Sequence, residues 1–152
     1  MTSPPAHPQS YVCPTTGTVQ LGRVLRPAAI PQQRWLPGHR GVDLALNVGE
    51  PVRAAGTGTV AVAGPVVGTP TVSIDHPDGI RTTYQPVYAT VSSGETVTAG
   101  QVIGRLAPST TGFPGLQWGA KIGSDGYLDP LTLLPLPVIR LKPLAAAAPA
   151  RP

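Results

Sequence analysis

The sequence predicts an all-β fold, a compact antiparallel β-sandwich or partly open barrel. Short runs of β-branched and apolar residues are separated by turn signals at close spacing, which is typical of such folds. No window carries a sustained helical apolar period, apart from a single turn at 129–134. The 18 glycines and 20 prolines among 152 residues agree with this, because both residues punctuate strands and interrupt helices.

Each expected element has its own local signal. Residues 71–76 alternate in polarity and lead into Pro77-Asp78-Gly79, a strong turn signal, so they should form a hairpin with residues 80–84. The turn at 129–134 should begin at Pro130, because proline fits the first position of a helix. The remaining predicted strands are rich in small and apolar residues and comprise 18–24, 51–63, 97–106 and 116–122.

The expected folded domain spans residues 17–134. Residues 1–16 are rich in Pro, Ser and Thr and are predicted to be disordered, and residues 135–152 form a Pro/Ala-rich tail. The hydrophobic fraction of 41% is enough for one modest core. Cys13 is the sole cysteine, which excludes an intramolecular disulfide.

The net charge of +4 does not indicate a nucleic-acid partner. Between residues 39 and 134 there are five Lys/Arg and seven Asp/Glu, a net of −2, and six basic residues in the flanks bring the total to +4. A nucleic-acid interface needs basic residues on the folded core with aromatic residues among them. We therefore expect no nucleic-acid partner. No apolar run approaches the roughly 20 residues that cross a bilayer, so we expect no membrane span.

The first twelve residues have neither the basic region nor the apolar segment of a signal peptide. Cys13 would be a lipid attachment site only behind such a segment. The chain as given is therefore expected to carry no export signal. Either the protein is cytoplasmic, or a signal lies upstream of this start or has been removed.

His39 and Asp43 form half of a metal site. In an extended backbone, side chains four residues apart point to the same side of the strand. An imidazole and a carboxylate are both good Zn²⁺ ligands, but a catalytic zinc has three protein ligands and a water. The three histidines of the chain are His7, His39 and His76, and the spacing alone provides no third ligand.

Blocks of the sequence, in a fixed order, resemble the lysostaphin/LytM-type zinc endopeptidase domain. The blocks are HRGVDL, PVRAAGTGTVAVAG, VSIDHPDGIRTTYQPV, VSSGETVTAGQVIG, LQWG and YLDPLTLL. The resemblance covers about residues 18–134, and the short forms of the blocks look most like actinobacterial relatives. It implies an antiparallel β-fold of the duplicated-hybrid-motif type. Active members cut peptide cross-bridges in bacterial peptidoglycan, so the resemblance also implies the cell envelope as the location.

The catalytic residues of that family are only partly present. The resemblance places His39 and Asp43 on the first two zinc ligands. The third ligand is the second histidine of a His-x-His motif, and here it is Gln117. The first histidine of that motif corresponds to Gly115, and a further catalytic histidine corresponds to Pro86. Three of these five positions therefore lack the histidine that the family has there.

These replacements remove the chemistry of a zinc hydrolase. The metal acts by lowering the pKa of a bound water to about 7 and by polarising the scissile carbonyl. A neutral amide is a poor zinc ligand, so residual zinc binding should be weak and we expect no resident cofactor. Glycine and proline side chains cannot exchange a proton, and acid–base catalysis is worth about 10²–10⁴-fold.

The leading hypothesis is a catalytically degenerate LytM-like domain that binds peptidoglycan or regulates a cell-wall hydrolase or division protein. Arg40, Tyr84 and Trp118 are candidate residues of its groove, although Trp118 is also a natural core residue and Tyr84 a natural packing residue. The alternative is an active or weakly active zinc endopeptidase with a rearranged site. A third hypothesis is a structural module that binds through its proline-rich tails.

Overall fold

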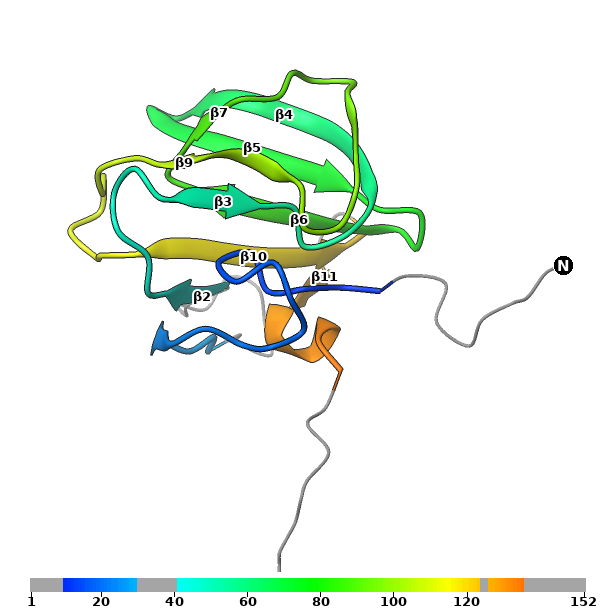
Figure 1. The fold of residues 1–152 in the computed structure, drawn as a ribbon, viewed down its shortest axis with the longest axis horizontal. Helices are drawn as coiled ribbons and strands as arrows, with labels where there is room; N and C mark the ends of the chain where they lie inside the picture. Colours follow the sequence, from blue (N-terminus) through cyan, green and yellow to red (C-terminus); the bar gives the residue numbers. More distant parts are fainter. Residues whose placement is uncertain (1–9, 30–40, 124–125, 136–152) are drawn as a thin grey trace, which may run out of the picture.

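The computed structural model describes residues 10–29, 41–123 and 126–135, and these residues form an all-β domain (Figure 1). This confirms the predicted fold class. The elements are β1 (Val24–Arg26), β2 (Gly41–Leu44), β3 (Pro51–Arg53), β4 (Gly58–Val66), β5 (Thr69–Asp75), β6 (Ile80–Gln85), β7 (Val87–Ala89), β8 (Thr96–Val97), β9 (Val102–Leu106), β10 (Leu116–Ile122), β11 (Gly126–Leu128) and the 3₁₀ turn η1 (Pro130–Leu133). No helix among the described residues is long and apolar enough to cross a membrane.

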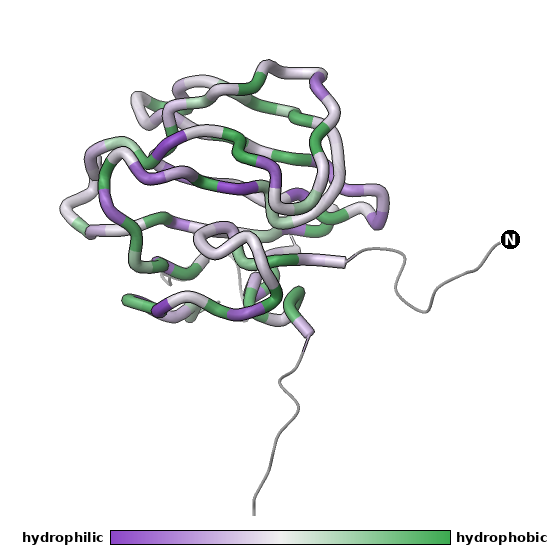
Figure 2. The backbone as a smooth tube through the Cα atoms, viewed as in Figure 1, coloured by the Kyte–Doolittle hydropathy of each residue, from purple (hydrophilic) through white to green (hydrophobic). Residues whose placement is uncertain are grey.

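The strands form two antiparallel sheets. The large sheet has the order β1-β2-β10-β6-β5-β4-β8, with β11 paired to the far half of β10. The small sheet has the order β3-β9-β7. Hydrophobic and hydrophilic residues follow one another along the strands (Figure 2). Each strand therefore presents an apolar face to the core and a polar face to solvent.

Strand β10 is central to this arrangement because it pairs with β2, β6 and β11. Its residues alternate in burial along its length. Leu116, Trp118 and Ala120 are buried, whereas Gln117 and Lys121 are partly exposed. The outer face of the large sheet is consequently built from residues of odd number in β10.

Most predicted elements are confirmed, with shifted ends. The hairpin at His76–Gly79 joins β5 to β6, and η1 begins at Pro130 with Asp129 capping the N–H of Leu131. The predicted strand 18–24 is wrong, because β1 starts at Val24. Local hydrogen bonds of threonine hydroxyls to neighbouring backbone groups bend the chain before it. Strands β7 and β11 were not predicted.

The expectation that the chain is disordered up to residue 16 is wrong for residues 10–16. Tyr11 and Cys13 lie in the core, and the sulfur of Cys13 is fully buried. Backbone bonds attach this segment to the domain, because Val12 N–H donates to the carbonyl of Ala55 and Arg53 N–H to that of Pro14. Residues 1–9 and 136–152 lie outside the described residues.

A directed chain of hydrogen bonds crosses the core. His76 Nδ1 lies 2.8 Å from the carbonyl of Thr57, which can only accept, so Nδ1 carries the proton. Its Nε2 therefore accepts from the hydroxyl of Thr82 at 2.7 Å. Tyr84 donates to Thr82 at 2.6 Å and accepts from the N–H of Ala55 at 2.9 Å. Burial raises the pKa of Tyr84 to about 12, so its hydroxyl remains a donor at neutral pH.

This chain makes stability depend on pH. Burial lowers the pKa of His76 below its usual 6.5, against the opposing influence of the Thr57 carbonyl and of Asp78 and Asp75. The unfolded chain therefore takes up the proton first, and stability present above pH 6.5 should be lost as the pH falls. Denaturant midpoints at pH 7.5 and 5 measure this loss. In His76→Gln, the denaturant midpoint should no longer decrease from pH 7.5 to pH 5.

Candidate functional site

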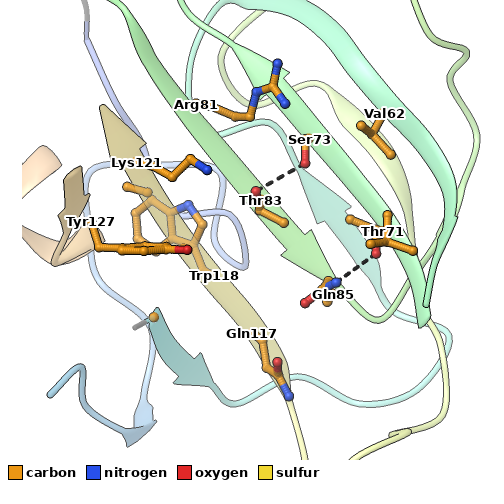
Figure 3. A pocket seen from close by; sticks show the side chains of 14 residues that line it. Val62, Thr71, Ser73, Arg81, Thr83, Gln85, Gln117, Trp118, Lys121 and Tyr127 are labelled. Carbon is orange, nitrogen blue, oxygen red and sulfur yellow. Dashed lines mark hydrogen bonds between the residues drawn. The ribbon is translucent and has the colours of Figure 1, made fainter. Parts of the chain in front are cut away.

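The outer face of the large sheet carries three rows of side chains, each row running across the strands at one register position. We call them the charged, middle and amide rows. Figure 3 shows most of these side chains on the same side of β10, β6 and β5. The charged row consists of Asp75, Arg81, Lys121 and Tyr127, and the middle row of Ser73, Thr83, Gly119 and Gly41. The amide row consists of Gln85, Gln117, Asp43 and Arg26. Thr71 extends the amide row through a hydrogen bond to Gln85.

The amide row contains two of the residues that the sequence singled out. Gln117 faces Asp43 on β2 and Gln85 on β6 as a direct cross-strand partner. Gln117 Nε2 donates to the hydroxyl of Thr111 at 3.2 Å, and Gln85 Nε2 donates to that of Thr71 at 2.8 Å. The position predicted to have lost a zinc ligand is thus adjacent to the surviving carboxylate, and its amide is engaged with a hydroxyl.

The carboxylate of Asp43 is held by a cation from the chain itself. Arg26 Nε donates to Asp43 Oδ2 at 2.9 Å, and the side chain of Asp43 is only 2% exposed. The guanidinium of Arg26 also lies 3.8 Å from the ring centroid of Phe113, a cation–π contact. The ion pair and the ring contact together hold Arg26 over the carboxylate.

Gly115 has a backbone that excludes a side chain. Its φ is +90°, and a Cβ built on it would lie 2.3 Å from the carbonyl oxygen of Leu44 and 3.0 Å from Leu25. A histidine cannot occupy this position without moving the junction of β2 and β10. Pro86, the other position at which the resemblance implies a histidine, is buried directly after β6, and its carbonyl accepts from the N–H of Ala107 at 2.8 Å.

The middle row has the smallest side chains of the three rows. Gly41 and Gly119 are cross-strand partners, and Gly119 faces Thr83 on its other side. A Cβ on Gly119 would meet nothing within 4 Å, so open space lies above it. The hydroxyls of Ser73 and Thr83 lie 3.1 Å apart and form a hydrogen bond (Figure 3).

The charged row places two cations on neighbouring strands. Lys121 and Arg81 are direct cross-strand partners. Arg81 is bound to Asp75 through two hydrogen bonds of 2.6 and 3.0 Å, which lower the pKa of Asp75 and raise that of Arg81. Lys121 Nζ lies 5.7 Å from the ring centroid of Tyr127. Asp75 offsets Arg81, so the row keeps one positive charge (−1 + 1 + 1 = +1).

These rows form the floor of a groove of about 450 Å³ that is open to solvent (Figure 3). Val62 and Val66 of β4 border it on one side and Tyr127 of β11 on the other. Among the described residues that line it, the charged side chains are Arg81 and Lys121, and the rest of the polar lining consists of amides and hydroxyls. The groove can therefore exchange hydrogen bonds with a ligand along its whole length.

The expected groove side chains are only partly found. Tyr84 and Trp118 are fully buried, because they sit at even-facing positions of β6 and β10 that point into the core. Both side chains belong to the core, as the alternative interpretation has it, and Trp118 also borders the groove. His39 and Arg40 lie outside the described residues.

The sequence pattern did not identify Arg26, Phe113 or the hydroxyls of the middle row as residues of the site. Arg26 lies 17 residues before Asp43, and nothing in the local pattern connects the two. Lys121 and Arg81 could have been found from the sequence, because both continue the polar alternation of their predicted strands.

The described residues do not fit a catalytic zinc. Asp43 is bound to Arg26, Gln117 offers an amide and Gly115 has no side chain. Within the described ranges no three His, Cys, Asp or Glu side chains gather as a metal site would require. Arg26 binds Oδ2 of Asp43, so a zinc ion that used this carboxylate would share it with the guanidinium.

Several solved structures have a similar fold. Csd3 of Helicobacter pylori matches with a TM-score of 0.66 and 27% identity, over 88% of this chain and 35% of that one. Lysostaphin of Staphylococcus simulans, an antimicrobial peptidase, matches with a TM-score of 0.63 and 26% identity, over 74% of this chain and 49% of its own. A zinc-containing peptidase of Vibrio cholerae, 23% identical with a TM-score of 0.61 over 72% of this chain and 36% of its own, shares the fold.

Sequence relatives occur in mycobacteria. Uncharacterized proteins of Mycobacterium tuberculosis and Mycobacterium bovis are 48% identical over 143 residues, which is 84% of this chain and 56% of each relative. The chain thus spans about half the length of these relatives. The family model of peptidase family M23 matches residues 37–130, which include the whole amide row except Arg26. This chain belongs to peptidase family M23, the family of the LytM-type fold.

Proposed function

We propose that this M23 domain is catalytically degenerate and binds peptidoglycan through the groove without hydrolysing it. The observation that carries the proposal is the 2.9 Å bond between Arg26 and Asp43. A carboxylate that serves a zinc ion must be available to it, and here the guanidinium neutralises the carboxylate from within the chain. The proposal requires a location in the cell envelope.

The backbone of the site supports the same conclusion. Catalysis in this family requires an imidazole near position 115, and the conformation of Gly115 leaves no room for one. Pro86 has no group that can donate or accept a proton. The described residues of this groove give a water neither a three-ligand metal site to lower its pKa nor a base to take its proton.

The polar rows nevertheless fit a peptide. Amide and hydroxyl groups of Gln85, Gln117 and Thr83 can each donate and accept, as an extended peptide backbone does. The two glycines of the middle row leave space for that backbone. Cell-wall peptide is therefore the ligand class that the groove suits best.

The first prediction concerns hydrolysis. Purified sacculi incubated with the protein should release no more soluble muropeptide than a buffer control, with or without a chelator. Elemental analysis of protein purified without a metal-affinity tag should find far less than one zinc per chain. Chelator-sensitive release together with about one zinc would instead establish the zinc endopeptidase of the alternative hypothesis.

The second prediction concerns binding. Gly119→Leu should fill the groove and reduce cosedimentation with sacculi about tenfold or more, since overlap with a bound ligand is not compensated. The fold should persist, because the added side chain enters open space at a strand position. Val67→Leu, at a fully exposed residue of the β4–β5 turn, is a matched control. Equal binding by Gly119→Leu would show that the groove is not the binding surface, and a hydrolase or division protein would then be the partner to test.

The third prediction concerns reconstruction of the metal site. Gln117→His combined with Arg26→Ala should bind zinc, because the first change restores a ligand and the second frees Asp43. Gln117→His alone should bind it at least tenfold more weakly, since Arg26 competes for the carboxylate. Isothermal titration with Zn²⁺ compares the two variants. Equal zinc affinity with and without Arg26 would contradict the role given to this ion pair.

Gly115→His should lower the free energy of unfolding by about 2–4 kcal/mol, the range for backbone strain and overpacking.

A further inference from the structure

Resting on the proposed function, we infer that the groove selects peptides that carry a carboxylate and that Lys121 receives it. Among the described residues of the floor, the charged row is the one that carries uncompensated charge. Its two cations, Lys121 and Arg81, are direct cross-strand partners.

The two cations are not equivalent. Arg81 gives two hydrogen bonds to Asp75, so its charge is already matched. Among the described residues no carboxylate pairs with Lys121, whose ammonium contacts the ring of Tyr127 at 5.7 Å. The ammonium is a flexible point charge at the groove wall, and a ligand carboxylate can reach it without breaking a pair.

The distribution of charge defines the class of ligand. A polyanion such as a nucleic acid or a phosphate polymer needs several free cations, because its affinity comes from the number of phosphates neutralised. The described lining of the groove offers one, Lys121. The other rows consist of amides, hydroxyls and glycines, which match peptide groups. The combination favours a peptide with a single carboxylate near one end.

The dimensions set the length of that peptide. Lys121 and Gln117 are four residues apart on β10, which corresponds to about 13 Å along an extended strand. An extended peptide of about four residues spans this distance. Its carboxylate would lie at the charged row and its far end over Gln117 and Gln85 in the amide row.

The test uses three synthetic peptides and the full chain. The first is N-acetylated tetra-alanine with a free terminal carboxylate, the second is its terminal amide, and the third is an amide in which the last alanine is replaced by glutamate. Dissociation constants are measured by titration at low and high salt. The first peptide should bind about three- to fivefold more tightly than the second, as expected for one exposed ion pair, and salt should reduce the difference. The third peptide distinguishes a side-chain carboxylate from a terminal one.

Lys121→Met should abolish the preference for the carboxylate, so that the acid and the amide bind equally well. Arg105→Gln is the control, because it removes the same charge from an exposed residue of β9 in the small sheet. Equal affinities for acid and amide, a preference that survives Lys121→Met, or no binding of any peptide would each overturn the inference. Cosedimentation of the unmodified protein with sacculi tests the proposed function separately, so the two can fail independently.

Discussion

The register of β10 is the constraint on which both the core and the groove depend. Because β10 pairs with β2 and β6 at the same time, the register determines which face of the sheet each side chain of β10 occupies. Trp118 then meets Val42 and Tyr84 inside the core, while Gln117 meets Asp43 and Gln85 outside. A slip of one residue would bury the glutamine and expose the tryptophan, at a cost of several kcal/mol in lost apolar burial and unsatisfied amide. The core therefore determines the composition of the groove.

Close contact between β2 and β10 excludes side chains at two positions of their junction. Gly41 is required on β2, because a Cβ there would lie 2.6 Å from the carbonyl oxygen of Trp118. Gly115 is required just before β10 for the same reason, with the carbonyl oxygen of Leu44 at 2.3 Å. The two strands approach each other through backbone atoms at these positions. A histidine at position 115 would therefore demand a new path for the backbone.

Local patterns predicted the strands well and the site only in part. Alternation in 71–76 indicated a strand, and the turn at Pro77-Asp78-Gly79 indicated its connection to the strand at 80–84. The sequence pattern could not tell which face of β10 lies against the core, since a tryptophan suits either a core or a groove. The adjacency of Asp43 and Gln117 was implied by family resemblance, and cross-strand pairing provides its physical basis. The pairing of Arg26 with Asp43 has no local signal, because two separate segments meet only in the fold.

The Arg26–Asp43 pair also determines the polarity of the groove. Because the guanidinium balances the carboxylate, the amide row is electrically neutral, and the positive charge of the floor is confined to the charged row about 13 Å away. A catalytic zinc would instead have concentrated positive charge in the amide row, next to the bond to be cut. On the proposed function, an anionic peptide is therefore drawn toward Lys121 and away from the position where hydrolysis would occur. On that proposal, a carboxylate bound by an arginine and a groove that binds without hydrolysing are two consequences of the same ion pair.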